Sequence, residues 1–232
     1  MSSYAVVLGG GSGKRMGAGQ NKVFLPVGGV PAIIRSIQAF QGLCRGVVAV
    51  IASGEENQLK ALIEQYGLSS FVLAILPGGK ERQDSVGNGL NALPADAQYV
   101  LIHDGARALV TEQVIRDSLK SAQQHGSGVA AVPVVDTIKR AAADGRVLET
   151  PDRASLYAMQ TPQTFRLSLI RQAHAIARQD GFLGTDDASL LEHASLPVYL
   201  SMGHRENLKL TTPVDLALAE LILQQREKEK QP

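Results

Sequence analysis

The sequence predicts an α/β protein with a mostly parallel central sheet and helices on both of its faces. Short apolar runs rich in Val and Ile alternate along the chain with segments whose apolar residues recur at helical spacing. The apolar runs contain few polar residues, which is typical of strands covered on both faces. We therefore expect a doubly wound, Rossmann-like sheet in which ligands bind beyond the carboxyl ends of the strands.

The first half of the chain alternates predicted strands and helices. The strands are residues 4–8, 46–51, 71–76 and 98–103. Pro31 stands at a favourable first helical position and starts a helix that runs to about residue 41. The next helix ends before Gly67, a residue type typical of helix C-caps. The helix after the third strand is marked by Val86, Leu90 and Leu93.

The second half continues the alternation, with one interruption. Thr111 is expected to cap a helix, and residues 129–135 form a further strand. Residues 137–148 predict two short strands around an Asp-Gly turn. Later elements are a helix over 169–176, a helix capped by Thr185 that runs through Leu191, a strand over 197–201, and a final helix after a capping box at 212–215. The charged tail from Arg226 is expected to fray.

Composition bounds the function classes. A length of 232 residues without a separating linker fits one domain spanning 1–232. The net charge of +1 argues against nucleic acid or a membrane surface as the main partner. The single cysteine, Cys44, excludes an internal disulfide and suits a reducing cytosol, so we expect a cytoplasmic protein. No apolar run approaches the roughly 20 residues of a membrane span.

A glycine-rich stretch follows the first predicted strand, where residues 9–13 contain only Gly and Ser and precede Lys14 and Arg15. Such a loop lets backbone N–H groups and cations converge on a phosphate. The P-loop pattern fails because Leu8 and Arg15 stand at its Gly and Ser/Thr positions. The dinucleotide pattern fails because Lys14 or Met16 takes the place of its third glycine. The stretch is thus a phosphate loop of another kind, or a plain surface turn.

Residues 10–16, followed by Asn-Lys-Val-Phe-Leu-Pro at 21–26, resemble the opening signature of nucleotidyltransferases that join a sugar or polyol phosphate to a nucleotide. Later motifs narrow the resemblance to the 2-C-methyl-D-erythritol 4-phosphate cytidylyltransferases of the non-mevalonate isoprenoid pathway. These motifs lie at residues 102–107, 136–140, 160–162 and 185–189. The resemblance runs from Tyr4 to about Glu220. It implies a reaction of CTP with 2-C-methyl-D-erythritol 4-phosphate that releases pyrophosphate.

This chemistry needs few acid–base groups. The incoming phosphate is already a nucleophile, so catalysis consists of positioning it and neutralising charge as it attacks the α-phosphorus. The expected inventory is cations, glycine loops and one divalent metal. No Cys/His spacing in the sequence suggests a zinc site. Mg²⁺ held mainly through the CTP phosphates fits how that ion is usually bound.

The resemblance implies roles for individual residues. Arg15 and Lys22 match the family residues that contact the triphosphate and stabilise the transition state. Arg153 and Lys209 match those that position the attacking phosphate. Solvated basic side chains are the alternative, and it applies most strongly to Lys14.

The resemblance also implies one set of nucleotide-binding residues and one set of substrate-binding residues. The nucleotide-binding set is Gly10, Gly11, Ser12, Gly13, Gly79, Ser85 and Asp104. The substrate-binding set is Arg107, Thr137, Arg153 and Lys209. Asp104 can reach a ribose hydroxyl or a metal-bound water, with a turn cap as the alternative. Ser85 can equally be an ordinary helix-surface serine. Gly105 and Ala108 depart from the family's usual Ala and Pro and loosen the loop that carries Arg107.

Some residues in these motifs receive a weaker assignment or none. Thr161 and the cluster of Thr185, Asp186 and Asp187 are second-tier candidates for the site. Asp186 and Asp187 are explained as negative charges at the N-terminus of a helix. His103 is assigned no role, because a buried histidine is more often a satisfied neighbour of a site than a catalyst.

The segment at about 136–153 is either a solvated excursion or, as the resemblance implies, a protruding β-arm that clasps a second subunit in a homodimer. Two alternatives to the leading function remain open. One is a ribitol 5-phosphate cytidylyltransferase of the same superfamily. The other is a non-catalytic nucleotide-binding module, which would have no need of Lys22, Arg153 and Lys209 together.

Overall fold

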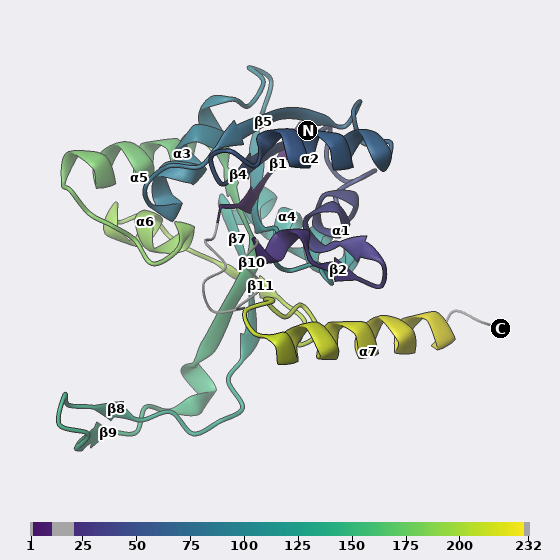
Figure 1. The fold of residues 1–232 in the computed structure, drawn as a ribbon. Helices are drawn as coiled ribbons and strands as arrows, with labels where there is room; N and C mark the ends of the chain where they lie inside the picture. Colours follow the sequence, from purple (N-terminus) through teal and green to yellow (C-terminus); the bar gives the residue numbers. More distant parts are fainter. Residues whose placement is uncertain (1, 11–20, 230–232) are drawn as a thin grey trace.

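A seven-stranded sheet forms the centre of the molecule (Figure 1). The structure is a computed structural model, and it describes residues 2–10 and 21–229. The strand order of the sheet is β11-β7-β10-β6-β1-β4-β5. Every neighbouring pair is parallel except the two pairs that contain β10. The strands are β1 (Ser3–Gly9), β4 (Val47–Ile51), β5 (Val72–Pro77), β6 (Tyr99–Asp104), β7 (Ser127–Pro133), β10 (Tyr157–Arg166) and β11 (Leu200–Met202). The predicted mostly parallel α/β fold is confirmed.

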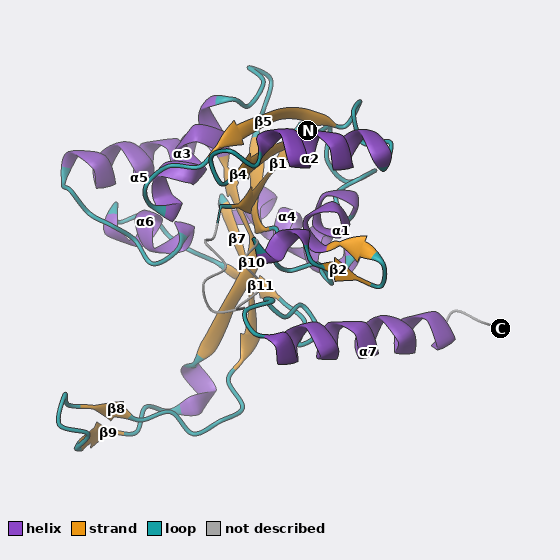
Figure 2. Ribbon diagram, viewed as in Figure 1, coloured by secondary structure: helices purple, strands orange, loops and turns teal. Residues whose placement is uncertain are grey.

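Helices cover both faces of this sheet (Figure 2). One face packs against α1 (Ala32–Gln38), α2 (Glu56–Gln65) and α4 (Glu112–His125). The helix α7 (Pro213–Glu229) adds Ala219 to the same core and packs beside residues 26–27. The other face packs against α3 (Arg82–Asn91), α5 (Leu167–Gln179) and α6 (Asp187–His193). In β1, Ala5 and Val7 join the first core, whereas Val6 and Leu8 join the second. This alternation explains why the strand is apolar at every position.

The strand β10 was not predicted, although it lies at the middle of the sheet between β6 and β7. Its central residues Gln160, Thr161, Gln163 and Thr164 are polar and yet buried. It also contains Pro162, a residue type that argues against a central strand. The ladder to β7 is irregular between Met159 and Gln163, so the proline falls where regular pairing is interrupted. The polar side chains find partners only in the tertiary structure.

Several element boundaries also differ from prediction. Pro31 is the N-cap of α1 and not its first residue, and the strand predicted at 129–135 covers 127–133. The N-cap of α6 is Asp186, whose carboxylate accepts from the Ser189 amide, rather than Thr185. The last strand is residues 200–202 and not 197–201. The helix α7 continues to Glu229 instead of fraying at Arg226, because the Arg226 guanidinium donates to Glu206 and to the Leu109 carbonyl.

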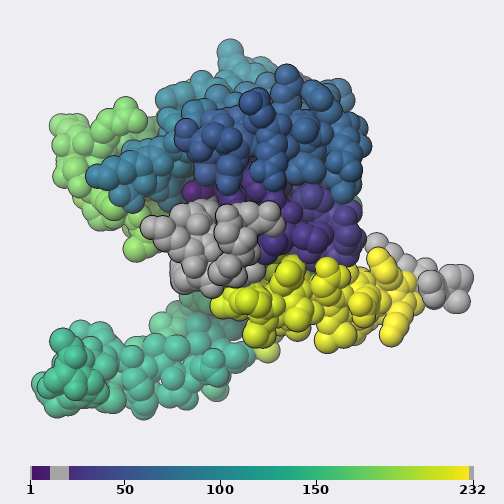
Figure 3. Space-filling view, viewed as in Figure 1, coloured from purple at the N-terminus to yellow at the C-terminus, as the bar shows by residue number. Residues whose placement is uncertain are grey.

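A two-stranded hairpin of β8 (Arg140–Ala141) and β9 (Val147–Glu149) stands apart from the body (Figure 3). Gly145 in its turn has a φ of +88°, which an Asp-Gly turn accommodates. The smaller elements are η2 (Lys22–Phe24), β2 (Pro26–Val27), β3 (Val30–Pro31) and η3 (Arg153–Ser155). Within residues 2–10 and 21–229, no helix is long and apolar enough to cross a membrane.

Candidate active site

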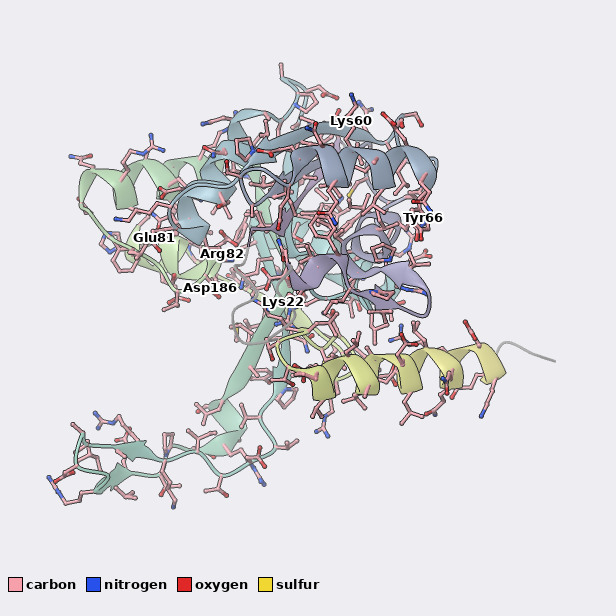
Figure 4. The ribbon with its side chains drawn as sticks, viewed as in Figure 1. Lys22, Lys60, Tyr66, Glu81, Arg82 and Asp186 are labelled. Atoms are coloured by element: carbon pink, nitrogen blue, oxygen red, sulfur yellow. The ribbon has the colours of Figure 1, made fainter. Side chains whose placement is uncertain are left out.

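A cleft of about 510 Å³ opens at the carboxyl ends of β1, β5 and β6. The chain leaves β1 toward β4 on one side and returns to β6 on the other, and a parallel sheet binds ligands at such a switch point. The polar side chains that line the cleft belong to Lys22, Lys80, Glu81, Arg82, Ser85, Asp104, Lys209 and Thr211. In Figure 4, Arg82 and Lys22 lie beside the sheet, whereas Lys60 and Tyr66 lie away from them, on α2 and at its end.

A glycine turn after β5 forms one wall of the cleft. A Cβ atom at Gly79 would lie 2.2 Å from the Asp84 Cβ atom, so only glycine fits. The Gly79 amide donates to the Ser85 hydroxyl at 3.0 Å, and that hydroxyl donates to the Glu81 carbonyl at 3.1 Å. Ser85 therefore holds the glycine turn against the start of α3, at the edge of the cleft.

Asn21 determines where Lys22 lies. Its buried side-chain amide donates to the Gly9 carbonyl at 2.6 Å and to the Glu55 carboxylate at 2.7 Å. The Asn21 side-chain oxygen accepts from the Val23 amide at 3.3 Å. The short helix η2 is thus tied to the end of β1 and to the start of α2, and Lys22 becomes part of the cleft wall.

Asp104, the last residue of β6, is the acidic centre of the cleft. The Lys209 ammonium lies 2.7 Å from its carboxylate, Arg82 Nε lies 3.7 Å away, and Arg107 Nε lies 4.0 Å away. Burial by itself would raise the pKa of the Asp104 carboxyl. The charges of Lys209 and Arg82 outweigh burial and hold that pKa well below its usual range. The carboxylate is therefore ionised at neutral pH.

A second carboxylate, the buried side chain of Asp187, forms an ion pair with Arg82. Arg82 Nη2 lies 2.6 Å from Asp187 Oδ2, and the Asp187 side chain is only 1% exposed. Burial disfavours the Arg82 charge, but Asp187 and Asp104 outweigh burial and raise the pKa of the guanidinium. The Gln163 side-chain oxygen accepts from the Asp187 and Ala188 amides at 3.0 Å, which fixes the start of α6. Asp187 is thus more than a charge at the end of a helix.

Comparisons with known proteins show the family of the chain. Residues 3–225 match the family model described as IspD: 2-C-methyl-D-erythritol 4-phosphate cytidylyltransferase. The chain belongs to this family. It is 48% identical over 229 residues to the 2-C-methyl-D-erythritol 4-phosphate cytidylyltransferase of Geobacillus thermodenitrificans, covering 97% of this chain and 99% of that protein. It is 44% identical over 220 residues to the same-named protein of Bacillus cereus, covering 94% and 96% of the two chains.

Solved structures agree with the family. The 4-diphosphocytidyl-2C-methyl-D-erythritol synthase of Anaerococcus prevotii superimposes with a TM-score of 0.85 at 27% identity, covering 96% of this chain and 98% of that one. The 2-C-methyl-D-erythritol 4-phosphate cytidylyltransferase of Thermus thermophilus superimposes with a TM-score of 0.79 at 31% identity, covering 97% and 100%. The recognition of this cytidylyltransferase family from its motifs is confirmed.

The structure gathers part of the predicted cytidylyltransferase site in the cleft. Six of the predicted residues line it, namely Gly10, Lys22, Gly79, Ser85, Asp104 and Lys209. Four predicted residues, Gly11, Ser12, Gly13 and Arg15, lie outside the described residues. Arg82 and Asn21 were not among the predicted site residues, and Asp187 was only a second-tier candidate. Arg82 follows the glycine turn at Gly79, and its partner Asp187 is 105 residues away.

Three predicted substrate-binding residues do not line the cleft of their own chain. Arg107 Nη1 donates to the Asn207 carbonyl at 2.6 Å, and the Arg107 side chain is 12% exposed. Thr137 and Arg153 are exposed near the base of the hairpin. Arg153 Nη1 donates to the Val135 carbonyl at 2.9 Å.

Proposed function

We propose that this chain joins CTP to 2-C-methyl-D-erythritol 4-phosphate and releases pyrophosphate, forming 4-diphosphocytidyl-2-C-methyl-D-erythritol. The observation that carries the proposal is the arrangement of Lys22, Lys209 and Arg82 around a cleft that also holds the carboxylate of Asp104. Cations and a glycine turn at the carboxyl end of a parallel sheet suit a reaction between two polyanions. Family membership supplies the identity of the substrates.

In the proposed reaction, an oxygen of the substrate phosphate forms a bond to the α-phosphorus of CTP. The bond from that phosphorus to the bridging oxygen of pyrophosphate breaks, and pyrophosphate carries away the electron pair. The attacking phosphate is largely ionised at neutral pH, since its second pKa is about 6. No side chain has to remove a proton. Lys22 and Lys209 neutralise the charge that builds up around the α-phosphorus, which is the largest contribution in such sites.

The nucleotide is oriented by backbone and by Asp104. The turn at Gly79 and Ser85 offers polar backbone groups to the edge of the pyrimidine. The Asp104 carboxylate lies at the carboxyl end of β6, where it can accept from a ribose hydroxyl or from a metal-bound water. These roles match the nucleotide-binding assignments that the sequence suggests.

We also propose that Mg²⁺ accompanies the triphosphate. Among residues 2–10 and 21–229, no group of three or more His, Cys, Asp or Glu side chains could hold a metal ion by itself. A cleft with one deep carboxylate and several cations fits an ion that is bound mainly by phosphate oxygens. Bound Mg²⁺ would supply further charge neutralisation at the triphosphate.

Pyrophosphate release tests the proposed function. We expect turnover with CTP, Mg²⁺ and 2-C-methyl-D-erythritol 4-phosphate, and a loss of about 100-fold or more in Lys22→Ala. The matched control is Lys60→Ala, because Lys60 is an exposed lysine on α2 away from the cleft (Figure 4). It should keep the wild-type rate.

Two other results would contradict the proposal in different ways. Turnover with ribitol 5-phosphate alone would preserve the mechanism and replace the substrate. No pyrophosphate with either polyol phosphate would favour a nucleotide-binding module without catalysis.

We further propose a homodimer in which the segment at about 136–153 forms an arm that contacts the second subunit. A lone two-stranded hairpin is marginally stable in water. This hairpin also exposes apolar side chains, with Ile138 41%, Val147 54% and Leu148 45% exposed. A second subunit would cover them and would bring its own cleft toward Arg153 and Thr137.

Sedimentation at micromolar concentration tests the arm. The wild-type chain should sediment as a dimer, and the double substitution Val147→Asp and Leu148→Asp should produce a monomer because it places charges in the apolar contact. Leu183→Asp is the matched control, since Leu183 is 58% exposed but belongs to the loop before α6. A monomeric wild-type chain would refute the arm contact.

A further inference from the structure

His103 is a fully buried histidine for which the reaction above has no use. It directly precedes Asp104 at the end of β6 and is 0% exposed. The Phe40 ring meets it edge-on, with ring centroids 5.3 Å apart. Both of its ring nitrogens nevertheless have polar partners. Nδ1 lies 3.0 Å from the Thr161 hydroxyl, and Nε2 lies 3.3 Å from the Arg107 carbonyl.

These partners determine which ring nitrogen carries the proton. The Arg107 carbonyl can only accept, so Nε2 of His103 must be the donor. A neutral imidazole has one N–H, and Nδ1 therefore accepts from the Thr161 hydroxyl. Burial lowers the pKa of His103 to about 4, so the ring is neutral at pH 7.

The same hydroxyl holds the backbone of Asp104. The Asp104 amide donates to Thr161 Oγ1 at 3.0 Å. The hydroxyl thus accepts from the Asp104 amide and donates to Nδ1 of His103, so the three groups form a hydrogen-bonded chain with one fixed direction of donation. Thr161 lies on β10, 57 residues after Asp104, so the chain ties the end of β6 to the neighbouring antiparallel strand.

The turn that follows Asp104 connects the hydrogen bonds of His103 to the segment that contains Lys209. The Arg107 amide donates to the Asp104 carbonyl at 2.9 Å, and the Leu210 amide donates to the Ala106 carbonyl at 2.9 Å. His103 contacts the far end of that turn through the Arg107 carbonyl. The backbone beside Lys209 is therefore attached to a turn that His103 holds at both ends.

We propose that His103 is a positioning residue for the cytidylyl transfer, acting through the Thr161 hydroxyl and the Arg107 carbonyl to hold Asp104 and Lys209 in the cleft. This role rests on the proposed function, because it concerns the residues that would contact CTP and the attacking phosphate. His103 itself is separated from the cleft and touches no substrate. A purely structural histidine would contribute stability without affecting the chemical step.

Kinetics of paired variants test the role. His103→Phe keeps an aromatic ring beside Phe40 but removes both hydrogen bonds, and Thr161→Val removes the hydroxyl at nearly constant shape. Each should lower kcat about 10- to 100-fold, with a smaller change in the KM for CTP, since groups that orient a site residue have effects of this size. Thr161→Ser keeps the hydroxyl and should restore most of the rate.

The double variant His103→Phe with Thr161→Val decides whether the two residues act as one chain. It should be no slower than the slower single variant, because both substitutions break the same connection. All rates are compared at a temperature at which circular dichroism shows each variant folded. Wild-type kcat in folded His103→Phe, or full additivity of the two losses, would overturn the proposal.

A long-range ¹H–¹⁵N spectrum of the histidine rings tests the geometry independently of turnover, with the His103 signals identified by their loss in His103→Phe. We expect the neutral form protonated at Nε2 at pH 7. A proton on Nδ1, or a charged ring, would overturn the proposed chain even in an active enzyme. If the protein releases no pyrophosphate although His103 has the expected tautomer, the proposed function is refuted, and the positioning role with it.

Discussion

Lys209→Ala is expected to lower kcat/KM for cytidylyl transfer by about 100- to 1,000-fold, as loss of one preorganised charge in an active site typically does. The Lys209 ammonium lies 2.7 Å from Asp104, and its side chain is 41% exposed at the cleft. It is therefore close to the acidic centre and accessible to a bound phosphate. Steady-state pyrophosphate release at saturating and limiting concentrations of each substrate measures the effect on kcat and KM separately.

The two parameters distinguish the possible roles of Lys209. A fall in kcat means that the ammonium acts mainly in the transition state, whereas a rise in KM alone means that it only binds the ground state. Lys120→Ala, at an exposed position of α4, is the matched control and should behave as wild type. A Lys209→Ala enzyme with more than half of the wild-type kcat/KM would remove Lys209 from the proposed mechanism.

Asp187→Ala is expected to lower the free energy of unfolding by about 3 kcal/mol, because breaking a buried ion pair leaves an uncompensated charge. The value lies at the low end of the usual range since the Arg82 side chain is 33% exposed and water can partly replace the lost partner. Without Asp187, Arg82 can turn toward Asp104 and compete with Lys209. Activity should therefore fall as well. Urea denaturation measures the stability change.

Two further variants should lose less unfolding free energy than Asp187→Ala. Asp187→Asn keeps an oxygen that can accept from Arg82 and should lose less stability than Asp187→Ala. Glu112→Ala breaks an exposed pair with Arg116 one turn along α4 and should cost only about 0.3–0.5 kcal/mol. If Asp187→Ala lowers the free energy of unfolding by no more than Glu112→Ala does, the buried pair contributes no more stability than an exposed one.

Much of the cleft could be predicted from local sequence. A glycine turn directly after an apolar strand places Gly79 at a strand end, and Asp104 follows another such strand. Because parallel strands end at the same edge of a sheet, Gly79 and Asp104 were expected to lie near the glycine stretch after the first strand, and Gly10, Gly79 and Asp104 line one cleft. The motif resemblance then supplied the chemistry, which the family comparison confirms.

The rest depended on partners far away in the chain. The pair of Arg82 and Asp187 joins residues 105 positions apart, and the contact of His103 with Thr161 spans 58 positions. No periodicity encodes such pairs, since each side chain alone has an ordinary surface or capping explanation. The polar strand β10 was missed for the same reason, because its buried Gln163 bonds to Asp186 and Asp187 at the start of α6.

The sequence by itself determined the α/β class, the order of most strands and helices, and the cytidylyltransferase family. These follow from apolar spacing, turn residues and short motifs, which act over a few neighbouring residues. Only the tertiary structure decided that Asp187 supports Arg82 and that Thr137 and Arg153 lie away from the cleft of their own chain. Packing of distant segments sets these positions, because the strength of a polar contact depends on burial and geometry that no local pattern contains.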